Sequence, residues 1–338
     1  MKAIEIKKPG EMRVVEMPKP GCEAGEVLLR IRYVGFCGSD LNSFRGSNSM
    51  ARYPLIPGHE VGAEIAEVGA NVPPTLQPGM TVTVNPYTSC GQCASCRRRR
   101  YNACEHNETL GVQRNGAMRE YLAVPWQKVI PVSGVSVCHS ALIEPMSVGF
   151  HAVDRAQVTD TDVVMVIGCG MVGMGAVIRA AVRGAMVIAV DVDDDKLAIV
   201  RKVGATHTIN SKSEDLHSRL LTLTHGLMPD VVIEAVGSPL TQKQAASEVA
   251  FTGRVVCIGY AKQESAFDTS LFVKKELDIR GSRNALPEDF ESVVKYLSHG
   301  TCPFEQFITK VVKPEEAIEA MRRWDADPGK VFRIVVEL

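Results

Sequence analysis

The chain has 338 residues, a formal net charge of −1 and 45% hydrophobic residues. This length favours two domains, and the near-neutral charge gives no support for nucleic acid or an anionic membrane as a partner. The N-terminus has no apolar signal segment and no run reaches the roughly 18 apolar residues of a membrane span, so we expect a cytoplasmic protein.

The first part of the chain, to about residue 145, contains short β-like runs that Gly and Pro residues interrupt. This pattern is typical of a small barrel-like all-β domain. Three runs alternate well enough to be predicted as strands: Glu26–Tyr33, Val61–Val68 and Met80–Val84.

The pattern then changes to apolar strands that alternate with helices, which indicates an α/β domain with a doubly wound parallel sheet. Six strands are predicted for this sheet: Val163–Ile167, Val187–Val190, Thr206–Ile209, Asp230–Ala235, Arg254–Ile258 and Leu277–Arg280. The predicted helices are Ser147–Arg155, Val172–Gly184, Asp194–Val203, Glu288–His299 and Pro314–Asp325. We expect the tail, which ends in a strand at Val331–Leu338, to rejoin the first domain. The predicted domains are therefore residues 1–146 with 287–338, and residues 147–286.

A glycine-rich turn follows the strand Val163–Ile167. Gly168, Gly170 and Gly173 have the G-x-G-x-x-G spacing, in which the glycines permit a tight turn, close approach to a pyrophosphate and close packing of the helix. Asp191 ends the next apolar run, where a carboxylate accepts hydrogen bonds from an adenosine ribose and repels a 2′-phosphate. With Lys196, the first basic residue after Asp191, these residues form the predicted binding site for NAD. The alternative is a glycine-rich turn in an ordinary α/β domain.

Four of the ten cysteines are close together in the sequence. Four thiolates at short spacing enclose a tetrahedral Zn²⁺ and leave no open coordination position, so this predicted site is structural. An iron–sulfur cluster and free thiols are the alternatives. The four residues are Cys90, Cys93, Cys96 and Cys104.

A second set of possible ligands is dispersed along the chain. Cys37 lies in GFCGSD, His59 and Glu60 lie in PGHE, and Glu144 lies in LIEP. A thiolate, an imidazole and a carboxylate together bind zinc and leave a position for water or substrate. Each residue alone is equally explained as a core cysteine, a satisfied histidine or a carboxylate at a helix start, and their spacing does not bring them together.

These motifs occur in the order and at the intervals of the zinc-dependent medium-chain dehydrogenases, which the chain resembles over nearly its whole length. LIEP is most similar to the sorbitol dehydrogenase branch. The resemblance implies a GroES-like β-barrel catalytic domain, a Rossmann domain with the active-site cleft between them, two zinc ions per chain, and a homodimer or homotetramer. It implies that Cys37 and His59 ligate the catalytic zinc, with Glu144 as the third ligand and Glu60 as either a ligand or an acid that acts through water.

The reaction that the resemblance implies is oxidation of a secondary alcohol with hydride transfer to NAD⁺. Ser39 matches the hydroxyl that accepts the alcohol's proton, and Asp40 would hydrogen-bond His59. A turn or helix cap is the alternative for Ser39 and Asp40. Asn42 stands where many relatives carry a histidine, so protons would leave through water or Glu60. Two smaller features are Ala63, at the second glycine of the family's GHExxG, and Arg333, which resembles a basic residue near the zinc-site acid.

The segment Ser282–Ala285 resembles the branch that oxidises hexonates such as L-galactonate or L-gulonate at C5. Arg283 and Asn284 are its predicted substrate contacts, and the Arg283 guanidinium suits a carboxylate. Pairing of Arg283 with a local acid or with the coenzyme is the alternative. The expected substrate is thus a sugar acid or polyol, and the rival hypotheses are a threonine 3-dehydrogenase-like enzyme and a non-catalytic protein that binds NAD and zinc.

Overall fold

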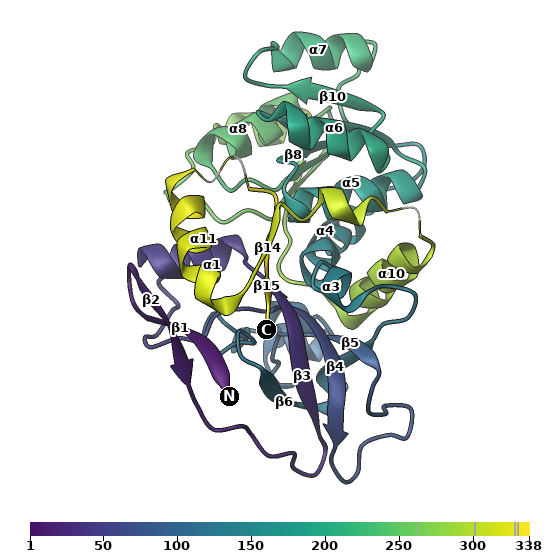
Figure 1. Ribbon diagram of the computed structural model, residues 1–338. Helices are drawn as coiled ribbons and strands as arrows, with labels where there is room; N and C mark the ends of the chain where they lie inside the picture. Colours follow the sequence, from purple (N-terminus) through teal and green to yellow (C-terminus); the bar gives the residue numbers. More distant parts are fainter. Residues whose placement is uncertain (262, 301, 328, 330) are drawn as a thin grey trace. The chain divides into compact units, whose positions relative to one another are not determined.

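The structure is a computed structural model that describes residues 1–261, 263–300, 302–327, 329 and 331–338. The chain divides into two compact units (Figure 1). The first unit comprises Met1–Glu144 and Leu286–Leu338, and the second comprises Pro145–Ala285. Each unit has its own sheet and its own apolar core.

The second unit is built on a parallel sheet of six strands in the order β10-β9-β8-β11-β12-β13. The predicted doubly wound sheet is confirmed, and each strand lies within one residue of its predicted ends. The chain reverses its direction of travel across the sheet between β8 and β11, and in doubly wound sheets ligands bind outside the carboxyl ends of the strands at such a point. The strands are β8 (Val163–Ile167), β9 (Met186–Asp191), β10 (His207–Asn210), β11 (Val231–Glu234), β12 (Arg254–Cys257) and β13 (Asp278–Gly281).

Side-chain caps define where several helices of this unit begin. Asp193, Asp215 and Ser238 each accept the backbone N–H three residues on and so satisfy one of the open donors of the first turn. The helices are α4 (Ile143–Ala156), α5 (Met171–Val182), α6 (Asp194–Lys202), α7 (Leu216–Leu223), α8 (Pro239–Glu248) and α9 (Thr269–Lys275). The predicted start of α4 at Ser147 is wrong by four residues, because Pro145 lies in the first turn, where its missing N–H is tolerated.

The first unit contains a seven-stranded sheet in the order β14-β15-β3-β4-β5-β7, with β6 paired to β3. Three of the predicted strands of this unit are confirmed to within two residues, and the predicted last strand, Val331–Leu338, joins this sheet but begins three residues later, at Ile334. The strands are β3 (Glu26–Gly35), β4 (Glu60–Val68), β5 (Thr81–Val84), β6 (Tyr121–Pro125), β7 (Val129–Pro131), β14 (Lys310–Val312) and β15 (Ile334–Glu337). A separate antiparallel pair is formed by β1 (Lys2–Lys8) and β2 (Glu11–Glu16).

The two ends of the chain share the core of the first unit. Strand β15 pairs antiparallel with β3, and Met321 and Trp324 pack in the same apolar cluster as Ile31 and Val61. The helical elements of this unit are α1 (Gly38–Arg45), α2 (Ala94–Arg97), α3 (Val137–Ser140), α10 (Pro287–Ser298) and α11 (Pro314–Ala326), with short 3₁₀ turns at Tyr101–Ala103, Trp126–Lys128 and Phe304–Gln306.

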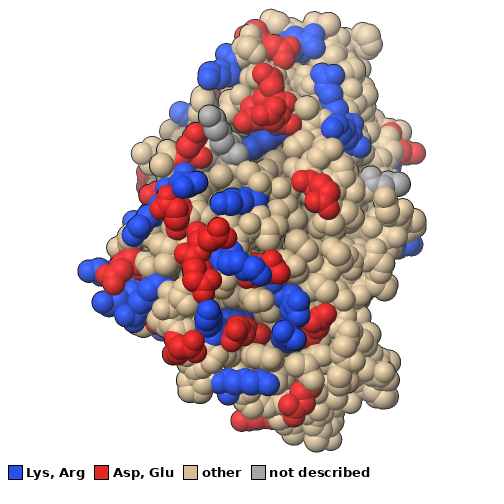
Figure 2. Space-filling model, viewed as in Figure 1, with Lys and Arg blue, Asp and Glu red and all other residues tan. Residues whose placement is uncertain are grey.

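The charges are mixed on the face that Figure 2 shows, where basic and acidic side chains alternate without a large area of one sign. Within the residues that the structure describes, no helix has both the length and the apolar character that a membrane span requires.

Candidate zinc and coenzyme sites

Strand pairing brings the first group of predicted ligands to one end of the sheet in the first unit. Cys37 follows β3 and caps α1, whereas Glu60 begins β4 directly after His59. Because β3 and β4 are antiparallel and Gly35 pairs with Glu60, the end of one strand meets the start of the other. The ligand atoms of Cys37, His59 and Glu60 all lie within 4.8 Å of one another.

The three side chains form an electrostatically coupled group. Burial by itself lowers the pKa of His59, but the neighbouring Cys37 and Glu144 outweigh it and raise the pKa well above its ordinary value. Burial raises the pKa of Glu60 to about 7, although the charge of Arg333 opposes the shift. Arg333 Nη1 lies 2.9 Å from Glu60 Oε1, and the guanidinium also donates to the carbonyl oxygen of Phe36.

Buried polar atoms at this place have no hydrogen-bond partner among the described residues. They are Ser39 Oγ, His59 Nδ1 and Glu60 Oε2, whereas Glu60 Oε1 lies at ion-pair distance from Arg333. Such atoms are costly unless a partner or a metal compensates for their desolvation. Sulfur, nitrogen and oxygen donors of these types form the ligand set that zinc takes in catalytic sites, so the residues present suit a zinc ion.

Glu144 lies beside the group rather than within it. This buried side chain projects from the first turn of α4 and accepts a hydrogen bond from the hydroxyl of Tyr87. Burial, followed by the charge of Glu144, raises the pKa of Tyr87 well above its ordinary value, so the hydroxyl remains a donor. Tyr87 was not among the residues predicted for the site, and its place just after β5 is the one sequence feature that could have indicated it.

The expected hydrogen bond between Asp40 and His59 is not formed in this structure. Asp40 Oδ2 accepts the N–H of Cys37 at 2.8 Å, and Oδ1 accepts the N–H of Gly58 at 3.2 Å. Asp40 is the third residue of α1, where a carboxylate reaches back to the residue that caps the helix. It therefore ties together the two backbone segments that carry Cys37 and His59, and its charge still contributes to the raised pKa of His59.

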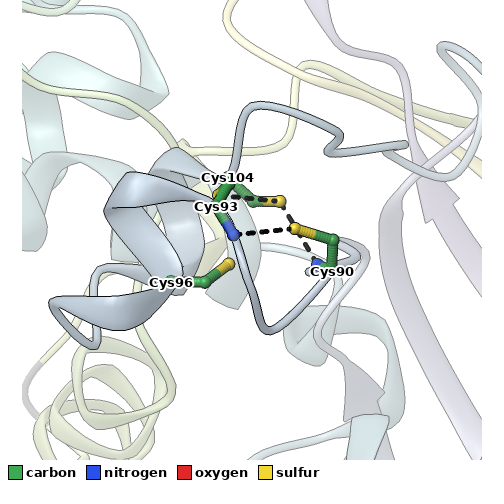
Figure 3. A group of neighbouring side chains, drawn as sticks. All are labelled: Cys90, Cys93, Cys96 and Cys104. Carbon is green, nitrogen blue, oxygen red and sulfur yellow. Dashed lines mark hydrogen bonds between the residues drawn. The ribbon is translucent and has the colours of Figure 1, made fainter.

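The four clustered cysteines come together in a loop of the first unit (Figure 3). All four sulfur atoms lie within 4.8 Å of one another, and Cys93 Sγ and Cys104 Sγ are 3.9 Å apart. Sulfur also accepts backbone N–H groups: Cys90 N donates to Cys104 at 3.3 Å and Cys93 N donates to Cys90 at 3.4 Å. A hydrogen bond with the Ser95 hydroxyl and backbone N–H groups lower the pKa of Cys93 to about 5, which favours the thiolate that binds metal.

The glycine loop after β8 makes a tight turn and packs closely on the start of α5. Gly168 has φ of +92°, and a Cβ on Gly173 would lie 1.8 Å from the Gly168 carbonyl oxygen. A Cβ on Gly170 would meet nothing within 4 Å, so backbone is open to a ligand there, at the N-terminus of α5. Asp191 Oδ2 accepts the N–H of Cys169 at 2.7 Å and so holds the loop against the end of β9.

The remaining predicted residues also lie in the second unit. Lys196 is in the first turn of α6, and its N–H is accepted by Asp193. Arg283 and Asn284 follow β13, are partly buried, and already interact with other groups in the protein. The structure therefore groups Cys37, His59 and Glu60 in one unit and the glycine loop with Asp191 in the other.

Two family models match most of the chain. Residues 23–134 match the model described as alcohol dehydrogenase GroES-like domain, and residues 172–299 match the model described as zinc-binding dehydrogenase. An L-galactonate-5-dehydrogenase of Escherichia coli (strain K12) is 34% identical over 294 residues, which are 87% of this chain and 86% of the relative. The chain belongs to the zinc-binding alcohol dehydrogenases.

Two further relatives cover nearly the whole chain. A sorbitol dehydrogenase of Bacillus subtilis (strain 168) is 32% identical, with 96% of this chain and 93% of the relative covered. A solved protein of E. coli CFT073, described as a short chain alcohol dehydrogenase complexed with NADH, has a TM-score of 0.91 and 29% identity and covers 100% of this chain and 99% of its own. The expected GroES-like and Rossmann architecture is confirmed, and the protein is an oxidoreductase of this zinc-binding family that acts on alcohols.

Proposed function

We propose that the protein oxidises a secondary alcohol of a sugar acid or polyol with NAD⁺, and that the first unit is its catalytic domain and the second its coenzyme-binding domain. The observation that carries this proposal is the group of Cys37, His59 and Glu60, whose unsatisfied buried atoms suit zinc. The substrate class is supported by the relatives that are named for L-galactonate and sorbitol.

Cys37, His59 and Glu60 would hold the catalytic zinc, and Glu144, which lies beside them and is held by Tyr87, stays a proposed further ligand. A zinc ion bound there supplies Lewis acidity that lowers the pKa of an alcohol hydroxyl, and nicotinamide accepts the hydride. Ser39, whose buried hydroxyl oxygen has no partner among the described residues, is proposed to accept the alcohol's proton. Asn42 does not titrate, so the proton passes on through Glu60 or water.

The other proposed zinc ion would be held by Cys90, Cys93, Cys96 and Cys104, which offer four thiolates and no position for substrate. For the coenzyme, we propose Gly168, Gly170, Gly173, Asp191 and Lys196 as contacts. NAD is favoured over NADP because the carboxylate of Asp191 repels a 2′-phosphate. Arg283 and Asn284 are proposed contacts to the substrate.

A substrate screen tests the proposal. NADH formation is measured with hexonates, hexitols and L-threonine, and each substrate is also assayed with NADP⁺. We expect turnover of hexonates or hexitols with NAD⁺ and much weaker turnover with NADP⁺. Activity on L-threonine alone would establish the rival amino-alcohol dehydrogenase instead.

A further inference from the structure

An open pocket of about 390 Å³ lies within the first unit and has no role in the function described above. Its volume is in the range of pockets that bind small metabolites, roughly 300–1,000 Å³. Its lining is mostly polar, with amide, hydroxyl, imidazole, carboxylate and guanidinium groups beside the apolar side chain of Met50. The residues that matter here are Ser49, Arg52, His106, Asn107, Glu108 and Gln113.

One wall of the pocket is tied to the helix that Cys37 caps. The segment with Ser49 and Arg52 follows α1 and is fastened back to it at Ser43. Asn48 Nδ2 donates to Ser43 Oγ at 2.9 Å, and the hydroxyl of Tyr53 donates to the Ser43 carbonyl at 2.5 Å. This wall is therefore held close to the turn that carries Cys37 and Ser39.

The opposite wall, residues 106–113, is tied to the other parts of the proposed zinc site. A Cβ on Gly111 would lie 2.4 Å from the backbone nitrogen of Gly58, the residue before His59. Glu108 N donates to Thr88 Oγ1 at 2.7 Å, directly after Tyr87, whose hydroxyl bonds Glu144. Both walls thus belong to segments that are tied to the backbone around the proposed zinc ligands.

The charges of the lining select one kind of ligand. Arg52 is exposed and makes no ion pair with a described residue, so its guanidinium offers paired N–H donors to a carboxylate. Glu108 contributes a carboxylate that accepts hydrogen bonds from hydroxyl groups, and its negative charge disfavours a doubly charged phosphate. A polyhydroxylated chain with a single terminal carboxylate matches both groups.

We propose that this pocket binds the carboxylate end of a hexonate substrate and that Arg52, rather than Arg283, pairs with the carboxylate. The proposal rests on the proposed function, and it makes Arg52 the residue that distinguishes a sugar acid from a polyol. Arg283 already interacts with another group within the protein.

The test compares L-galactonate with galactitol, which differ only in the carboxylate at C1. Specificity constants are measured for the wild type, Arg52→Met and Arg283→Met. We expect Arg52→Met to lower the ratio of L-galactonate to galactitol specificity about 10- to 100-fold, since a charge-assisted bidentate pair is lost. Arg283→Met should lower both specificity constants by a similar factor. An unchanged ratio in Arg52→Met, or a lowered ratio in Arg283→Met alone, would overturn the proposal.

A binding measurement separates this inference from the proposed function. Melting temperatures are measured with and without L-galactonate or galactitol, so no turnover is needed. L-galactonate should stabilise the wild type and not Arg52→Met, whereas galactitol should stabilise both proteins alike. If the wild type shows this pattern but reduces no NAD⁺, the proposed reaction fails and the pocket assignment stands. A wild type that L-galactonate does not stabilise, or that galactitol 1-phosphate stabilises more strongly through Arg52, contradicts the assignment.

Discussion

Tyr87 holds a buried acid beside the proposed zinc ligands. Its hydroxyl donates to Glu144, and its ring packs edge-on against Phe290 at a centroid distance of 6.3 Å. Because its pKa is raised well above the ordinary value, the hydroxyl keeps its proton throughout the usual range of assay pH. A buried carboxylate depends on such a donor, since water is excluded from it.

Replacing Tyr87→Phe removes this donor and leaves the ring in place. We expect the free energy of unfolding to fall by about 1–3 kcal/mol, because Glu144 loses its partner while it remains buried. Urea denaturation measures the change. Tyr101→Phe is the matched control, since Tyr101 is 43% exposed, and it should change stability by less than about 0.5 kcal/mol. Equal stability of Tyr87→Phe and the wild type would show that the hydrogen bond is not important.

At this scale the residue types of the site could be predicted from the sequence, but their contacts could not. The spacing of the four cysteines predicts a group, because ligands on one short loop meet without help from the rest of the fold. The predicted hydrogen bond from Asp40 to His59 is not formed, since one carboxylate oxygen accepts the nearby N–H of Cys37 and the other accepts the N–H of Gly58, which is 18 residues away. Tyr87 was missed because its partner lies 57 residues away.

The turn from β8 to α5 is the element that the coenzyme proposal depends on. Gly170 and Gly173 have different physical roles in it. Gly173 is required by the protein itself, because its Cα packs against the carbonyl of Gly168. Gly170 has open space beside it and φ of −68°, a value that any residue adopts.

The two substitutions Gly170→Ala and Gly173→Ala should therefore separate binding from stability. Gly173→Ala should lower stability by about 1–3 kcal/mol or more, as a Cβ forces the helix away from the strand. Gly170→Ala should cost less than about 1 kcal/mol, the usual difference at a helix cap, yet weaken NADH binding at least about tenfold by occupying the space that we assign to the pyrophosphate. Thermal unfolding without coenzyme and fluorescence titration with NADH measure the two effects. Unchanged NADH affinity in Gly170→Ala would place the pyrophosphate elsewhere.

Glu234, at the carboxyl end of the central strand β11, forms hydrogen bonds that hold the loop after this strand. Its Oε1 accepts the N–H groups of Val236 and Gly237 and the hydroxyl of Thr241, each at 2.8 Å. The side chain is fully buried, and a Cβ on Gly168 would lie 2.6 Å from Val236 Cγ2. Glu234 thus positions the loop that packs on the glycine turn.

Removing this carboxylate with Glu234→Ala should raise the KM for NAD⁺ by about tenfold or more, because three hydrogen bonds that shape the loop are lost. The KM for the alcohol and the zinc content should change little, since these depend on the first unit. Glu276→Gln provides a control at an exposed glutamate of the same unit. A fall in kcat with no change in the KM for NAD⁺ would exclude this positioning role.

Helices and strands could be predicted from the sequence where burial requires a run of apolar residues. The strands β8, β9 and β11 are apolar on both faces because helices cover both sides of a parallel sheet, and these strands were placed to within one residue. The start of α4 was misplaced because Pro145 normally signals a break, whereas in a first turn it removes no hydrogen bond. The pair β1–β2 was not predicted as separate strands.

Across the whole molecule, the two units differ in how local their contacts are. In the second unit, most strands that follow one another along the chain are also neighbours in the sheet. The exception is the step from β10 to β11, where the chain returns to the other side of β8. In the first unit, β15 pairs with β3 from the other end of the chain. No local pattern specifies that pairing, because it depends on burial of the shared core. A homodimer or homotetramer stays a prediction that light scattering would test.

The central claim is that Cys37, His59 and Glu60 hold a zinc ion required for alcohol oxidation. The most direct measurement is zinc content per chain together with NADH formation, in the wild type and in Cys37→Ala. We predict two zinc ions per chain and activity in the wild type, and one zinc ion, retained by the cysteine loop, with no activity in Cys37→Ala. A Cys37→Ala protein that keeps two zinc ions and forms NADH at the wild-type rate would contradict this account.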